Sequence, residues 1–343
     1  MARALGWPRL AAAGALGLAL ALPALLQGSY ALHLLVLSAL WAILAVSFNV
    51  IAGYRGLLSL VHVAFFAVGA YVSGLGTLRL GLSFWLALPL AGAAAVASAL
   101  AIGWVVLRMP VHAFIIASVA VAVIVNLVLL NWVEVTNGPM GLAGVMPPRL
   151  ALGALEVDFT DRTAYYYLVL VVLLGYLALE RLFVRSRFGR AALALRENPV
   201  LAEAHGLDPL RHGLIAFGLG ALGAGLSGSL YAHYMSVVSP ELATFVYMTL
   251  LVVMVVVGGR ATLAGPLLGA ALFIFLPETL RLTKGYRDSA IGLTLMLTVR
   301  FLPEGIVGAT RESWRRLARR RAGARVGDEP RADHAATGSP RAQ

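Results

Sequence analysis

Charged and hydrogen-bonding side chains gather in one segment of this chain, between Arg185 and Pro240. A first helical run in it ends at Glu197, and a second is opened by Pro199 and closed by Gly206. Mixed charges among small residues suit a surface that docks a partner protein. They equally suit a solvated amphipathic connection, and the residues alone leave both interpretations open. The charges of this segment include Arg190, Arg196 and Glu203.

Motifs that perform chemistry by themselves are absent from the sequence. It contains no GxxxxGK[ST], and its single lysine, Lys284, lies in no glycine loop, so the chain cannot hydrolyse ATP through a P-loop. It has no paired carboxylates, HExxH or nucleophile elbow, and without cysteine it has no disulfide or thiolate metal site. A membrane enzyme therefore ranks last among the functions considered, and no cofactor or metal is expected on this chain.

A few polar side chains interrupt long apolar segments. An unpaired polar group in hydrocarbon costs several kcal/mol, so each needs a partner or a water-lined path. For His62 the alternatives are a side chain that lines a pathway and an interhelical hydrogen bond that only sets packing; we favour the second. The translocation-pathway candidates are Asn49, Ser59, His62, Phe65, Ser118 and Asn126.

The composition requires a membrane-embedded fold. Of 343 residues, 60% are hydrophobic and 13% charged, far from the soluble norm of about a quarter charged. A span needs about 20 mainly apolar residues. We predict an all-α, polytopic bundle of about ten spans, with eight spans and a re-entrant hairpin near 244–281 as the alternative. The expected spans are Leu10–Leu26, Ala31–Ile51, Leu57–Leu78, Phe84–Leu107, Ala113–Val133, Ala164–Phe183, His212–Tyr234, Thr244–Val257, Gly265–Arg281 and Ser289–Phe301.

Arginine placement predicts the orientation. The net charge of +11 comes from arginines at helix ends and in the tail, which favours topology signals and lipid contact over nucleic acid. Both termini are expected in the cytoplasm, although the connection around Arg281 and Lys284 disagrees. The predicted parts are an N-terminal span at 1–30, a transmembrane domain at 31–308 with periplasmic loop 134–163 and cytoplasmic loop 184–211, and an Arg-rich cytoplasmic tail, partly disordered, at 309–343.

Small residues recur at four-residue spacing in two segments, a pattern that lets helix backbones approach closely. They predict helix contacts within this subunit or with a second one. The residues are Gly220, Ala224 and Gly228, and the pair Gly265 and Gly269.

The pattern G-R-A-x-x-A-x-R-E-N-x-x-x-A-E-A-x-G from Gly189, followed by a Gly/Ala-rich helix and L-Y-A-H-Y-x-x-x-x-S-P-E, resembles the LivM-type permeases of branched-chain amino acid ABC importers. Further matches run from Asn49 through Tyr71, and from Gly258 to Gly305. The resemblance implies that the 184–211 loop meets the ATPase, through Gly189, Arg190, Ala191, Arg196, Glu197, Asn198, Ala202, Glu203 and Gly206.

The resemblance also implies partners. These are a second homologous permease, two ATPase subunits that use ATP and Mg, and a periplasmic binding protein that delivers an amino acid. A T-[GN]-G-x-x-G-L element in the outer loop is a candidate contact for that binding protein, with a plain turn as the alternative. Its residues are Thr136, Asn137, Gly138 and Gly141.

Two other transport functions remain. One is a sister importer for urea or short amides. The other is an ion-coupled secondary transporter, which usually places an ionisable residue in mid-membrane. Here Glu180, Glu241, Glu278 and Arg300 all fall near predicted span ends, which disfavours it. The predicted location is the bacterial inner membrane.

Overall fold

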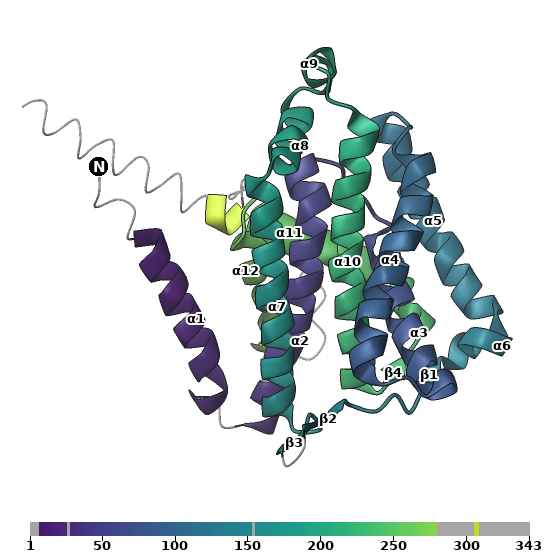
Figure 1. Ribbon diagram of the computed structural model, residues 1–343, viewed down its shortest axis with the longest axis vertical. Helices are drawn as coiled ribbons and strands as arrows, with labels where there is room; N and C mark the ends of the chain where they lie inside the picture. Colours follow the sequence, from purple (N-terminus) through teal and green to yellow (C-terminus); the bar gives the residue numbers. More distant parts are fainter. Residues whose placement is uncertain (1–6, 26–27, 153–154, 280–304, 309–343) are drawn as a thin grey trace, which may run out of the picture.

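The computed structural model describes residues 7–25, 28–152, 155–279 and 305–308. The chain is a helical bundle whose long helices run side by side (Figure 1). Six helices are long and apolar enough to cross a membrane. They are α2 (Ser29–Asn49) with its continuation η2 (Val50–Arg55), α3 (His62–Leu80), α4 (Phe84–Val106), α5 (Val111–Asn131), α7 (Arg162–Arg185) and α10 (Pro209–Met235).

Helix α10 lies at the centre of the bundle and packs along α2, α3 and α4. Its small residues permit this, because a Cβ at Gly220 would meet Ile51 and the Ser47 carbonyl of α2, and one at Gly228 would collide with Phe66 and Ala70 of α3. Ala224, between them, is fully buried. The predicted small-residue face therefore makes contacts inside this subunit.

Two shorter apolar helices form an antiparallel pair, α11 (Phe245–Gly258) and α12 (Gly265–Thr279). At 1.5 Å per residue their 14 and 15 residues extend about 21 and 22 Å, short of the roughly 30 Å of hydrocarbon. A Cβ at Gly265 or Gly269 would collide with the backbone of Gly259 or Met254, so both glycines allow the close pairing. The pair occupies the segment for which a re-entrant hairpin was the alternative.

Helix α1 (Trp7–Leu25) is attached through tyrosines of α7. Pro23 lacks the N–H that would bond the Ala19 carbonyl, and the Tyr166 hydroxyl donates to that carbonyl instead, at 2.9 Å. The neighbouring Tyr167 hydroxyl donates to the Leu20 carbonyl at 3.1 Å. The predicted last span, Ser289–Phe301, and the tail at 309–343 lie outside the described residues.

Short strands and turns close one end of the bundle, the sheet end. Strand β1 (Leu142–Ala143) pairs antiparallel with β4 (Val237–Val238), and β2 (Arg149–Leu152) with β3 (Leu155–Asp158). The predicted all-α bundle thus carries two small two-stranded sheets. Single turns complete this end, as α6 (Val133–Thr136), η3 (Gly138–Met140) and η4 (Pro240–Ala243).

Candidate functional site

Two short helices stand at the other end of the bundle, the α8–α9 end (Figure 1). Helix α8 (Arg187–Glu197) begins where Ser186 accepts hydrogen bonds from the amides of Phe188 and Gly189. Helix α9 (Pro199–Ala204) begins where Asn198 accepts from the Leu201 amide, with proline at the first helical position. The positive φ of Gly206, 81°, ends it. Pro199 and Gly206 are the signals from which the sequence predicted the second of these helices.

Helix α8 lies with one face on the bundle. Ala192 and Leu195 are fully buried, and Ala192 belongs to a small apolar cluster with Val50, Phe183 and Ala216. A Cβ at Gly189 would collide with the Phe183 carbonyl, so glycine is needed where α8 folds back on α7. The segment is therefore a packed element rather than a solvated connection.

The opposite side of α8 and α9 is open. It combines charged side chains with two apolar ones, Val200 at 79% exposed and Leu201 at 57% exposed. Large apolar side chains at that exposure, surrounded by charges, are typical of a protein-binding surface. Of the coupling candidates, the exposed residues are Arg190, Arg196, Glu197, Asn198, Glu203 and Gly206, and the buried ones are Gly189, Ala191 and Ala202.

Arg196 joins α8 to the transmembrane helices. Its Nη1 donates to the Gly53 carbonyl at 2.7 Å, and its aliphatic stem covers Gly56, whose φ of 77° suits glycine. Gly53 lies in η2, a π-helical turn that ends the first long span. Nearby, the buried Arg55 lies in electrostatic range of Glu203 on α9. Both short helices are thus linked to the same turn.

One turn deeper lies a group of polar contacts that we call the Asn49 cluster: Asn49 with Glu180, Ala261 and Thr262. The Asn49 Nδ2 donates to Glu180 Oε1 and to the Thr262 carbonyl, each at 3.1 Å. Its Oδ1 accepts from the Ala261 amide at 2.9 Å. Asn49 and Glu180 are fully buried, and a Cβ at Gly53 would collide with the Asn49 Oδ1. The cluster ties α2, α7 and the α11–α12 turn together.

Glu180 received no role from the sequence. The structure leaves its Oε2 buried without a hydrogen-bond partner among the described residues. An acidic residue in an apolar segment indicates that it needs a polar partner. The sequence did not reveal which one, because Asn49 lies 131 positions away.

The other pathway candidates make separate contacts among the helices, and their place on a transport path stays a prediction. His62 Nε2 is hydrogen bonded to Ser47 Oγ at 2.8 Å, and its ring lies between Phe48 and Phe65. An interhelical hydrogen bond is what the packing interpretation requires, but His62 Nδ1 is buried without a hydrogen-bond partner among the described residues, and the role of His62 stays a prediction. The Ser118 hydroxyl accepts from the Leu60 amide, next to the buried Ser59, and the Asn126 side chain donates to the Pro240 carbonyl at 2.7 Å.

The candidate loop for the binding protein is a compact turn at the sheet end. The Thr136 hydroxyl donates to the Leu129 carbonyl, and the Asn137 side chain donates to the Gly141 carbonyl. Asn137, Gly138 and Gly141 have positive φ values of 63°, 55° and 66°. A Cβ at Gly141 would collide with Val238 of β4. The local motif thus builds the turn that pairs β1 with β4.

Two features of this end were not anticipated. His233 is 1% exposed; its Nδ1 donates a hydrogen bond to the Met146 carbonyl at 2.7 Å, and its Nε2 is hydrogen bonded to Ser73 Oγ at 3.0 Å. In the β2–β3 hairpin, hydrogen bonds from the Thr160 hydroxyl and amide lower the pKa of Asp158 below its usual range.

No group of three His, Cys, Asp or Glu side chains that could hold a metal occurs within residues 7–25, 28–152, 155–279 and 305–308. Within the described part of the chain, six helices long and apolar enough to cross a membrane, with buried polar contacts between them, are typical of a multi-pass membrane protein. Comparison with known proteins agrees. Residues 30–299 match the family described as branched-chain amino acid transport system, permease component.

The relatives belong to the same kind of system. The chain is 33% identical over 295 residues to the high-affinity branched-chain amino acid transport system permease protein LivM of Escherichia coli (strain K12), covering 80% of this chain and 69% of the relative. It is 26% identical over 290 residues to the LivH permease protein of that organism, covering 79% and 92%. No solved structure matches the chain. The chain therefore belongs to the branched-chain amino acid permease family, and it is a transport subunit, not an enzyme.

Proposed function

We propose that this chain is the transmembrane permease subunit of an ATP-driven ABC importer for branched-chain or related hydrophobic amino acids, in a bacterial inner membrane. Its partners are a second homologous permease, two ATPase subunits that use ATP and Mg, and a periplasmic binding protein. Relatives with both the LivM and the LivH name support a pair of permeases. The observation that carries the proposal is the α8–α9 element, with an open charged face and a hydrogen bond into the bundle.

The orientation follows the arginines. In this proposal the α8–α9 end faces the cytoplasm, with both termini on the same side, because Arg55, Arg108 and the arginines of α8 belong to connections on that side. The sheet end then faces the periplasm, where the turn of Thr136, Asn137, Gly138 and Gly141 is a contact for the binding protein.

The mechanism is alternating access. Closure of the two ATPases moves α8 and α9, and Arg196 passes the movement to the Gly53 turn. Because the Asn49 cluster joins that turn to α7 and to the α11–α12 pair, the helices shift together. Packed elements switch between discrete arrangements rather than deforming gradually, which turns a small shift into a change of access.

The test replaces Arg196 and Glu197 by alanine in the assembled importer in proteoliposomes. Loss of a hydrogen bond from a charged group is worth about 1.5–3 kcal/mol, so we expect uptake to fall about 10-fold or more while ATP hydrolysis continues. The matched control is Arg187→Ala on the same helix, whose guanidinium lies over the neighbouring Phe188 ring at 5.0 Å. Normal uptake per ATP in the double variant would refute the coupling role.

Co-purification separates the other functions. An ATPase that stays bound in detergent supports the importer, whereas an ion-coupled transporter would purify without one. Uptake across a panel of leucine, valine, alanine, phenylalanine, urea and acetamide then identifies the cargo class.

A further inference from the structure

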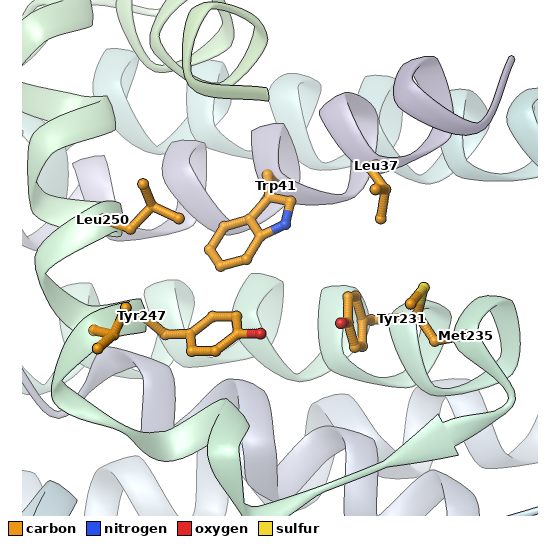
Figure 2. Close-up of a pocket in the computed structure, with 7 residues that line it drawn as sticks. Leu37, Trp41, Tyr231, Met235, Tyr247 and Leu250 are labelled. Atoms are coloured by element: carbon orange, nitrogen blue, oxygen red, sulfur yellow. The ribbon is translucent and has the colours of Figure 1, made fainter. Parts of the chain in front are cut away.

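A cavity lies apart from the α8–α9 element, toward the sheet end. It has a volume of about 360 Å³, at the small end of the range of roughly 300–1,000 Å³ that is usual for small-molecule sites. It opens between α2, α10 and α11, as Figure 2 shows. We call it the aromatic pocket, and its lining residues are Leu37, Trp41, Tyr231, Met235, Val246, Tyr247 and Leu250.

The wall of the pocket is apolar and ordered. Trp41 is 6% exposed and stacks on Tyr247, with ring centroids 5.5 Å apart and an angle of 11° between the planes. Its other neighbour is Phe66, which also contacts Tyr231 edge to face at 5.5 Å. Such ring pairs hold their positions without filling the space between helices.

One edge of the pocket is polar. The side chains of Tyr231 and Tyr247 both line the pocket, and both lie in electrostatic range of the exposed carboxylate of Glu241 in η4. Figure 2 shows the Tyr247 hydroxyl pointing toward Tyr231. The pocket combines apolar rings with two hydroxyls and a nearby carboxylate, which suits a cation that carries a short apolar chain. The acyl chain of a lipid would contact only the apolar rings.

The pocket also shares its walls with the Asn49 cluster. Helix α2 carries Trp41 and, two turns later, Asn49. Helix α11 carries Tyr247 near its start and leads into the turn of Ala261 and Thr262, which Asn49 binds. A movement that reaches the Asn49 cluster therefore moves both walls.

We propose that the aromatic pocket is a substrate station on the transport path, which holds the aliphatic side chain of an amino acid against Trp41 and Tyr247 with its ammonium group toward Glu241. This assignment rests on the proposed function. It adds the residues that determine selectivity among amino acids by the size of the amino acid side chain. In this proposal the α8–α9 element does not discriminate between substrates and only transmits the movement of the ATPases.

The experiment reduces the pocket and measures selectivity. In the complete importer in proteoliposomes, with its binding protein, Leu250→Trp fills part of the cavity, and uptake of leucine and alanine is compared. Because one methylene in a fitted apolar site changes discrimination by about 10-fold or more, we expect the leucine-to-alanine ratio to fall by at least about 10-fold. ATP hydrolysis stimulated by the binding protein stays near the wild-type rate.

Two further variants complete the design. Val246→Phe, at a lining residue that is 72% exposed, tests the same prediction if Leu250→Trp fails to assemble. Val171→Trp on α7, 67% exposed and outside the pocket, is the matched control and leaves the ratio unchanged.

The outcomes separate the two proposals. If the pocket variants slow leucine and alanine equally, or leave both unchanged, the pocket is not a substrate station. If the wild-type importer carries no amino acid at all, the proposed function fails first, and it fails independently of the pocket.

Discussion

The two ends of the bundle are built in opposite ways. At the α8–α9 end, directed hydrogen bonds of Arg196 and Asn49 join backbones that glycines bring into contact. At the sheet end, the aromatic pocket is held by stacked rings of Trp41 and Tyr247 around an open space. The first arrangement is closely packed, since a Cβ at Gly53 or Gly189 would collide with its neighbours. The second leaves an open pocket between some of the same helices. Helices α2 and α11 can therefore transmit movement through the Asn49 cluster at one end and hold a ligand in the aromatic pocket at the other.

The largest effect is expected from removing the Asn49 side chain, which tests whether hydrogen bonds hold the α8–α9 end together. Asn49→Leu leaves the Glu180 carboxyl, the Ala261 amide and the Thr262 carbonyl buried without their partner. Buried groups left unpaired cost about 1–3 kcal/mol each, so we expect a loss on the order of 3–5 kcal/mol in unfolding free energy. Chemical denaturation of the purified protein in detergent measures it.

A double variant is the control for Asn49. Replacing both partners by apolar groups removes the unpaired carboxyl group, so Asn49→Leu with Glu180→Leu should recover part of the lost stability. A double variant as unstable as the sum of the two single variants would show that the pair does not interact.

A smaller effect is expected from a single methyl group in the turn that Arg196 contacts. Gly53→Ala places a Cβ where the Asn49 Oδ1 lies, and overpacking of this kind costs about 1–3 kcal/mol. The matched control is Gly175→Ala in α7, where nothing lies within 4 Å of the new Cβ. There, helix propensity predicts a gain of about 0.5–1 kcal/mol. Thermal unfolding of the two variants should shift in opposite directions.

The smallest effect concerns His62. Ser47→Ala removes the hydrogen bond to His62 Nε2, and interhelical bonds in membranes are worth about 0.6 kcal/mol on average. A packing role predicts this small loss of stability with uptake unchanged. A fall in transport rate at normal stability would instead place His62 on the substrate path.

Local signals were sufficient for much of the fold. The apolar runs predicted the long helices within a few residues, and Pro199 and Gly206 set the limits of α9. The turn from Thr136 to Gly141 was also determined by local sequence, since its positive φ values fall on Asn137 and on glycines. What the sequence could not supply was pairing between distant segments.

The site shows this limit most clearly. The turn at Gly53 and the turn after Gly258 lie about 200 positions apart, and nothing in the local sequence indicated that they meet. Their contact runs through the Asn49 side chain across 212 positions to Ala261. Likewise, the sequence shows Trp41 and Tyr247 only as aromatic residues in two apolar segments. Their stacking is seen only in the folded structure.

The sequence by itself determined that this chain is a membrane-embedded helical bundle with a polar element of two short helices, because hydropathy, span length and capping residues act over neighbouring positions. Only the tertiary structure decided which polar side chains pair, that Arg196 reaches the Gly53 carbonyl, and where the bundle stays open. Those outcomes depend on the distances between helices. Helix distances are set by packing of glycines and rings from several segments at once, which no single stretch of sequence encodes.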